Sequence, residues 1–358
     1  MADAADILAP DAIEGWPLPE AQDEWYGSPE VERLLIEAYR GGRMHHAWLI
    51  GGPKGIGKAT LAYRFARFAL AYPDPSVAPD AETLEVSPNA PAARKIAAGS
   101  HPNLLTLSRP YDEKNKRFLS SLSIDEVRRT IPFFGSTAGE AGWRIAIVDS
   151  AEDMNINAAN ALLKILEEPP KRSLFLVLSH APGRLLPTIR SRCRRLDLEP
   201  LPADAIERAL ARHTDADVDA RRFAAEAGRG SLRRAIRFLD EDVAAIGRAF
   251  ASAIGSMPEL NASSAHALGD IVAQRGADEA FEGFQDLVFD WLARRARGED
   301  EPAELGALPP AAAAVPLAAW AEVWEKVRLA SAEVEALNLD RKQFVLTTLT
   351  MLARATRM

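Results

Sequence analysis

The fold of this chain is decided by residues 52 to 58, which read Gly52-Pro53-Lys54-Gly55-Ile56-Gly57-Lys58. They lie between the apolar run 47–50 and the amphipathic segment 58–71, which predict a strand and a helix. The spacing matches G-x-x-x-x-G-K, in which backbone amides and the lysine surround a phosphate at the start of a helix. The sequence therefore predicts a phosphate loop.

The residue after Lys58 departs from this motif. A hydroxyl usually stands there and binds magnesium, but this chain has Ala59. Thr60 is one residue further, about 100° around a helix, and cannot simply replace it. We therefore assign no metal ligand.

A second departure follows the apolar run 144–149, which ends in Asp149. In phosphate-loop proteins a carboxylate at this place holds the metal and its waters. The alternative, a helix-capping aspartate at the end of a strand, is the weaker interpretation of Asp149, and the phosphate loop disfavours it further. Hydrolysing proteins of the AAA type usually have a glutamate next, to polarise the attacking water, but here the residue is Ser150. We expect Glu152 to point elsewhere, and together these departures predict a protein that does not hydrolyse ATP.

The pattern of the first 200 residues predicts an α/β domain. Near-continuous apolar strands alternate with helices, which is typical of a parallel sheet covered on both faces. We expect residues 1–24 to be an irregular lead-in, 72–93 a surface excursion and 111–117 a charged loop. The expected strands are 47–50, 104–107, 144–149 and 174–178, and the expected helices begin at 29, 58, 123 and 157.

Strand signals end near residue 200. We predict three domains: 1–200, a phosphate-loop α/β domain; 201–240, a small helical bundle; and 241–358, an all-helical domain. Residues 301–316 read as a linker between helices. An apolar stripe at helical spacing faces either the core or a partner, and it comprises Val323, Val327, Ala330, Val334 and Leu337.

Composition sets further bounds. The chain has 358 residues, 47% of them hydrophobic, and a net charge of -8, so it has no overall basic surface for nucleic acid. The single cysteine, Cys193, excludes an internal disulfide and fits a reducing compartment; we expect a small buried residue. We find no signal peptide or membrane-spanning run, and expect a cytoplasmic protein with no membrane partner.

Two segments carry a family resemblance. Residues 157–170 read NAANALLKILEEPP, and Ile189-Arg190-Ser191-Arg192-Cys193 follows the fourth strand. Both resemble the clamp-loader branch of the AAA family, and the missing hydrolytic groups are similar to its delta-prime subunits of bacterial DNA polymerase III. The resemblance is strong over residues 25–240 and continues weakly to Asn338-Leu339-Asp340. It implies a phosphate-loop AAA-type domain with a helical lid at 201–240, then an all-α collar for oligomerisation.

The resemblance also implies a function. Such a subunit helps load the sliding clamp onto primed DNA, within an assembly of delta and gamma or tau subunits. It is not catalytic by itself, although it belongs to a DNA-directed DNA polymerase holoenzyme. Arg192 matches the arginine finger, which acts on ATP bound by a neighbouring motor; without the resemblance it reads as a solvated arginine. A finger supplied in trans accelerates turnover by roughly 10³–10⁵.

Further positions follow from the same resemblance. Ser179 matches the first sensor, and Arg233, in Gly230-Ser231-Leu232-Arg233, either senses a γ-phosphate or packs the lid. Because Lys58 and the glycines are intact, binding of ATP or ADP without hydrolysis stays open. Many relatives carry four zinc-binding cysteines after the phosphate-loop helix, but residues 72–103 have none, so we expect no zinc.

Two alternatives are weaker. An active gamma- or tau-like ATPase motor predicts a hydroxyl at position 59 and a glutamate at position 150, and both are missing. A small-molecule kinase is disfavoured by the long helical C-terminal half. Direct DNA contact through residues 114–117, Arg128 and Arg129 competes with the simpler reading of solvated charges.

Overall fold

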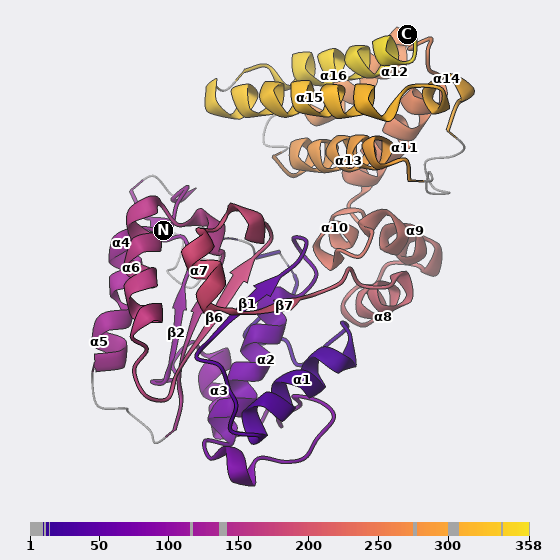
Figure 1. Ribbon diagram of the computed structural model, residues 1–358. Helices are drawn as coiled ribbons and strands as arrows, with labels where there is room; N and C mark the ends of the chain where they lie inside the picture. The colour runs from indigo at the N-terminus through magenta and orange to yellow at the C-terminus, as the bar shows by residue number, and fades with distance from the viewer. Residues whose placement is uncertain are drawn as a thin grey trace. The chain divides into compact units, whose positions relative to one another are not determined.

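The computed structural model describes residues 10, 12–13, 15–114, 117–135, 142–274, 278–299, 308–337 and 339–357. Figure 1 shows the chain coloured by residue number. The chain forms two compact units. One comprises Met1–Ala209 with Gly230–Arg233, and the other comprises Leu210–Arg229 with Arg234–Met358. The division into three domains remains a prediction.

A five-stranded parallel sheet forms the centre of the first unit. Its order is β2-β5-β6-β1-β7, so the strand before the phosphate loop lies between β6 and β7. This confirms the parallel α/β fold and the four expected strands. The strands are β1 (Ala47–Gly51), β2 (Leu104–Leu107), β5 (Arg144–Val148), β6 (Ser173–Ser179) and β7 (Arg194–Asp197).

Helices cover both faces of this sheet (Figure 1). Trp48 and Ile50 of β1 belong to one apolar cluster, whereas Ala47 and Leu49 belong to the other, as alternation along a strand requires. The first cluster packs under α1 (Pro29–Arg40), α2 (Lys58–Ala71) and α3 (Pro91–Ala97). The second packs under α4 (Ile124–Arg128), α5 (Thr130–Gly135), α6 (Ile156–Glu167) and α7 (Pro187–Arg192).

The structure modifies two expectations about loops. Residues 72–90 are mostly exposed or half-buried, as expected of a surface excursion, but Leu84 and Val86, between η2 (Pro75–Val77) and α3, are buried in the first cluster. Their apolar side chains are widely spaced among proline and acidic residues, so no periodic signal marks them. The expected charged loop at 111–117 contains β3 (Tyr111–Asp112), which pairs antiparallel with β4 (Arg117–Phe118).

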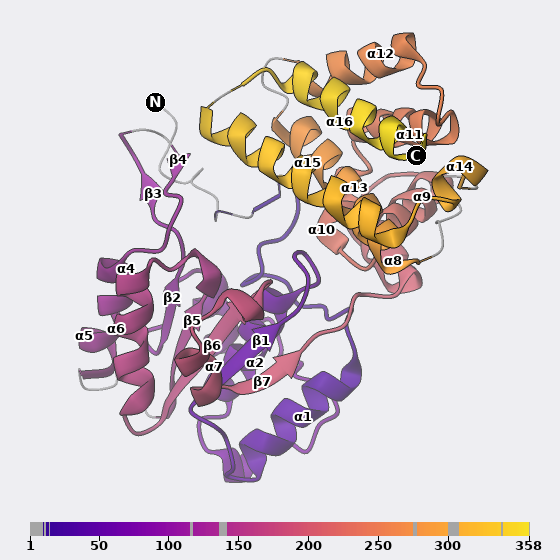
Figure 2. The same cartoon turned by 45° about the horizontal axis from the view of Figure 1, so that its top comes forward.

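The described chain beyond residue 202 is helical (Figure 2). In the second unit, Trp291 meets Trp320 and Phe250 edge to face. Arg237 pairs with Asp286 and Glu282, which joins α10 to α13. The helices are α8 (Ala203–His213), α9 (Val218–Gly228), α10 (Leu232–Arg237), α11 (Glu241–Gly255), α12 (Ala262–Val272), α13 (Asp278–Arg297), α14 (Pro310–Ala313), α15 (Leu317–Leu337) and α16 (Arg341–Ala355).

The predicted stripe lies on α15 and divides between core and surface. Val323, Val327 and Val334 are buried, whereas Leu337 is 67% exposed. The short helix α14 lies within the expected linker, of which residues 301–307 are outside the described part. No helix among the described residues is both long and apolar enough to span a membrane.

Candidate functional site

The phosphate-loop sequence forms the turn between β1 and α2. Gly55 and Gly57 have φ angles of +80° and +95°, which other residues rarely adopt. Gly57 is the residue before the first turn of α2, and Ile56 is buried in the first apolar cluster. The expected order of strand, glycine-rich turn and helix is therefore confirmed, while phosphate binding stays a prediction.

Lys58 is turned onto the loop itself. Its Nζ donates to the carbonyl oxygens of Gly52 at 2.8 Å and Pro53 at 2.6 Å, and the residue is buried. Ala59, which follows, packs against the apolar cluster under α2. The Lys58 ammonium therefore bonds back to carbonyl groups of its own loop. The Ala59 side chain has no oxygen that could bind a metal.

The segment around Arg233 lies against the phosphate loop. A Cβ at Gly55 would lie 2.3 Å from Ser231 Oγ and 2.5 Å from Arg233 Cβ. The backbone amide of Arg233 also donates to the Gly55 carbonyl at 3.4 Å. Only glycine fits at position 55 with this segment in place. Whether Arg233 senses a phosphate or only packs there stays a prediction.

Trp25 is a neighbour of the loop that sequence reasoning missed. A Cβ at Gly57 would be 3.1 Å from its indole ring, and its Nε1 donates to the Ser28 carbonyl at 3.0 Å. The ring therefore lies beside the N-terminal end of α2. Its position just after an irregular lead-in gave no periodic signal.

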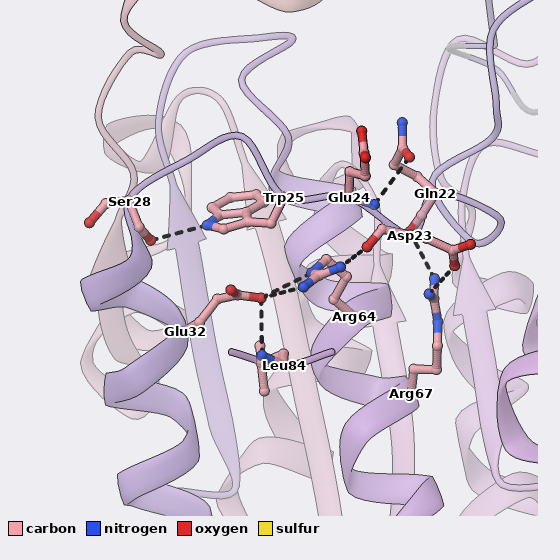
Figure 3. A network of polar contacts seen from close by, with 9 residues as sticks. All are labelled: Gln22, Asp23, Glu24, Trp25, Ser28, Glu32, Arg64, Arg67 and Leu84. Carbon is pink, nitrogen blue, oxygen red and sulfur yellow. Dashed lines mark hydrogen bonds and ion pairs between the residues drawn. The ribbon is translucent and has the colours of Figure 1, made fainter. Parts of the chain in front are cut away.

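Two arginines of α2 pair with α1 and with the segment before Trp25 (Figure 3). Arg64 Nη2 lies 2.9 Å from Glu32 Oε1, and these two side chains are 5% and 2% exposed. Arg67 Nη1 lies 2.8 Å from Asp23 Oδ1, and its Nη2 donates to the Gln22 carbonyl at 3.0 Å. Both arginines come from α2, so one helix carries the loop and anchors the lead-in.

Asp149 and Ser179 lie at the edge of the sheet where the loop begins. Asp149 directly follows β5, and Ser179 ends β6 in register with Gly51 of β1. Because the three strands are parallel neighbours, their carboxyl ends meet there. Ser179 is fully buried, and its Oγ accepts from the Ala181 amide at 3.1 Å. The fold thus brings both residues to the expected edge, but their roles stay predictions.

Glu152 binds the turn after β6. Its Oε1 accepts from the His180 amide at 2.8 Å and the Ala181 amide at 3.2 Å, and lies 2.7 Å from His180 Nδ1. Burial alone raises the pKa of Glu152, but the hydrogen bond from the His180 side chain and the nearby amides outweigh it and lower the pKa to about 2. This carboxylate joins the ends of β5 and β6.

Arg192 is the last residue of α7. Its Nη2 lies 2.7 Å from Glu167 Oε1, at the end of α6, and its Nη1 donates to the Thr188 carbonyl at 3.1 Å. The side chain is 35% exposed. Cys193 beside it is half-buried, and burial raises the pKa of its thiol to about 12, so it is protonated at neutral pH. The contact with Glu167 was not expected from the sequence.

Two of the arginines considered for DNA contact form ion pairs with acidic side chains of the same segment. Arg128 lies 3.1 Å from Asp125, and Arg129 lies 2.5 Å from Glu126, each within one helical turn. The residues 115 and 116 of the basic loop lie outside the described part. Within the described residues, no group of three or more His, Cys, Asp or Glu side chains is placed to hold a metal.

Comparison with known proteins shows what residues 27–202 are similar to. Residues 27–202 match the family model described as DNA polymerase III, delta subunit. The chain is 40% identical over 167 residues to the DNA polymerase III subunit delta' of Pseudomonas aeruginosa, covering 46% of this chain and 47% of that protein. It is 32% identical over 220 residues to subunit delta' of Escherichia coli, covering 61% and 62%.

The chain is also similar to a DNA polymerase III subunit that has a different name. The DNA polymerase III subunit tau of Bacillus subtilis is 26% identical over 230 residues, covering 63% of this chain and 38% of that protein. The matches to the two delta' proteins span 47% and 62% of those relatives' length. Residues 27–202 of this chain are therefore similar to the DNA polymerase III delta-subunit family, and the two delta' proteins share this similarity over part of their length.

Proposed function

We propose that this chain is a non-hydrolysing, delta-prime-like subunit of a DNA polymerase III clamp loader. The observation that carries the proposal is the pair of substitutions at the phosphate loop. Ala59 has no hydroxyl for magnesium, and Ser150 has no carboxylate to polarise water. The delta' names of the relatives support the same assignment.

The remaining carboxylate near Ser150 does not replace the lost base. Glu152 already accepts hydrogen bonds from His180 and Ala181, and its side chain is 3% exposed. Moving it to a water beside the loop would break these contacts and leave the amides without their acceptor. The geometry therefore supports absence of turnover, whether or not ATP or ADP is held by the loop.

In the proposed role, the chain acts on a nucleotide bound by its neighbour. Arg192 is half-buried at the end of α7, where it is accessible and partly fixed. It would neutralise charge that develops on the transferred phosphoryl group. Its partners would be delta and gamma or tau subunits in the cytoplasm, the sliding clamp, and primed DNA reached through the complex.

Phosphate release by the isolated chain tests the proposal against an active motor. We expect no ATP turnover above background, and higher turnover when the chain joins gamma or tau with delta, clamp and primed DNA. If the isolated chain hydrolyses ATP and Lys58→Ala abolishes this activity, the proposal is wrong and the chain is an active ATPase motor. Calorimetry with millimolar ATP or ADP separately decides binding, because the absence of heat and of a thermal shift excludes it.

A further inference from the structure

The contact between Glu167 and Arg192 joins the ends of two helices. The atoms Glu167 Oε1 and Arg192 Nη2 are 2.7 Å apart, and the side chains are 43% and 35% exposed. A pair at this exposure contributes little to folding, because water screens it. Its main consequence is the direction in which it holds the guanidinium.

Two different nitrogens of Arg192 are fixed. Nη2 binds Glu167 on α6, while Nη1 donates to the Thr188 carbonyl on α7. Contacts at two corners of a planar group define its orientation. The guanidinium has more N–H donors than these contacts use, so donors remain for the oxygens of a phosphate.

We infer that Glu167 is a positioning residue for Arg192, which holds the guanidinium ready for the polyphosphate of a nucleotide bound by the neighbouring subunit. This inference rests on the proposed function of Arg192. An arginine that is already oriented loses less side-chain entropy when it meets its ligand. Functional groups held by such supporting contacts are also placed more exactly than free side chains.

The test measures ATP turnover by the reconstituted complex with clamp and primed DNA. Glu167→Ala is expected to lower kcat about tenfold, as is common when a supporting contact is lost. The KM for ATP should stay unchanged, because the neighbouring subunit makes the main contacts with the nucleotide. Glu167→Gln should recover most of kcat, because its amide oxygen can accept the same hydrogen bond.

Glu168→Ala is the matched control. It removes the same charge from the next exposed residue, so kcat should equal that of the wild type. In an Arg192→Ala background, Glu167→Ala should cause no further loss, because the two residues act as a unit. Size-exclusion chromatography first establishes that every variant enters the complex.

The outcomes separate this inference from the proposed function. If Arg192→Ala loses stimulation but Glu167→Ala retains it or increases it, positioning by Glu167 is wrong and the finger stands. If Glu167→Gln is as impaired as Glu167→Ala, the hydrogen-bonded positioning is also wrong. If Arg192→Ala stimulates fully, the finger itself is wrong, and the role of Glu167 fails with it.

Discussion

Lys58 Nζ donates a 2.8 Å hydrogen bond to the carbonyl oxygen of Gly52, six residues earlier in the same loop. The lysine that defines the motif is thus part of the loop's own structure. The positions that would complete a hydrolytic site hold Ala59 and Ser150. The loop keeps its shape while two groups needed for turnover are missing.

Restoring one hydrolytic group is expected to be insufficient. Ala59→Thr supplies a metal-binding hydroxyl but leaves no base, and Ser150→Glu supplies a carboxylate but no hydroxyl. Phosphate release by each isolated variant should therefore stay at background. Turnover in Ala59→Thr alone would show that position 150 is not what prevents hydrolysis.

The buried pair Arg64–Glu32 should be important for stability. Arg64→Ala leaves the Glu32 carboxylate buried without its guanidinium, which costs about 3–5 kcal/mol in the free energy of unfolding. Urea unfolding followed by circular dichroism measures this loss. Arg33→Ala, which breaks the exposed pair with Glu30, should cost no more than about 1 kcal/mol. Equal effects of both variants would contradict the account.

Glu152 should make stability depend on acid pH. Its pKa falls from an ordinary 4.5 to about 2 in the folded protein, so the ionised form stabilises the fold. This contribution, about 1.5–3 kcal/mol for hydrogen bonds to a charged group, is fully present above pH 4.5 and is lost as the pH falls toward 2.

Glu152→Gln tests this dependence. The difference in unfolding free energy between wild type and variant should be largest above pH 4.5 and should shrink below it. Glu85→Gln, at an exposed position, is the control and should show little difference at any pH. A difference for Glu152→Gln that does not change with pH would exclude the ionised carboxylate as its source.

The sequence predicts the strands whose side chains are buried on both faces. Such strands are continuous apolar runs, as residues 144–148 illustrate, and they can be recognised directly. β7 was missed because it reads Arg194-Arg195-Leu196-Asp197, and in this edge strand only Leu196 is buried. Its charged side chains give no apolar run.

The phosphate loop could also be predicted, because its residues are contiguous and its glycines have a local conformational cause. The contact between Arg192 and Glu167 could not, because it spans 25 residues and depends on how α6 packs against α7. The position of Trp25 beside Gly57 likewise depends on the ion pair between Asp23 and Arg67, which are 44 residues apart. Local patterns carry no information about such contacts.

The measurement that tests the central claim most directly is ATP turnover by the motor subunits with delta, clamp, primed DNA and either wild-type protein or Arg192→Ala. We expect wild type to stimulate turnover, and Arg192→Ala to enter the complex but lose stimulation by a factor of roughly 10³ or more. Arg190→Ala, which removes an exposed arginine from the same helix, should stimulate as wild type does. Full stimulation by Arg192→Ala would contradict the account.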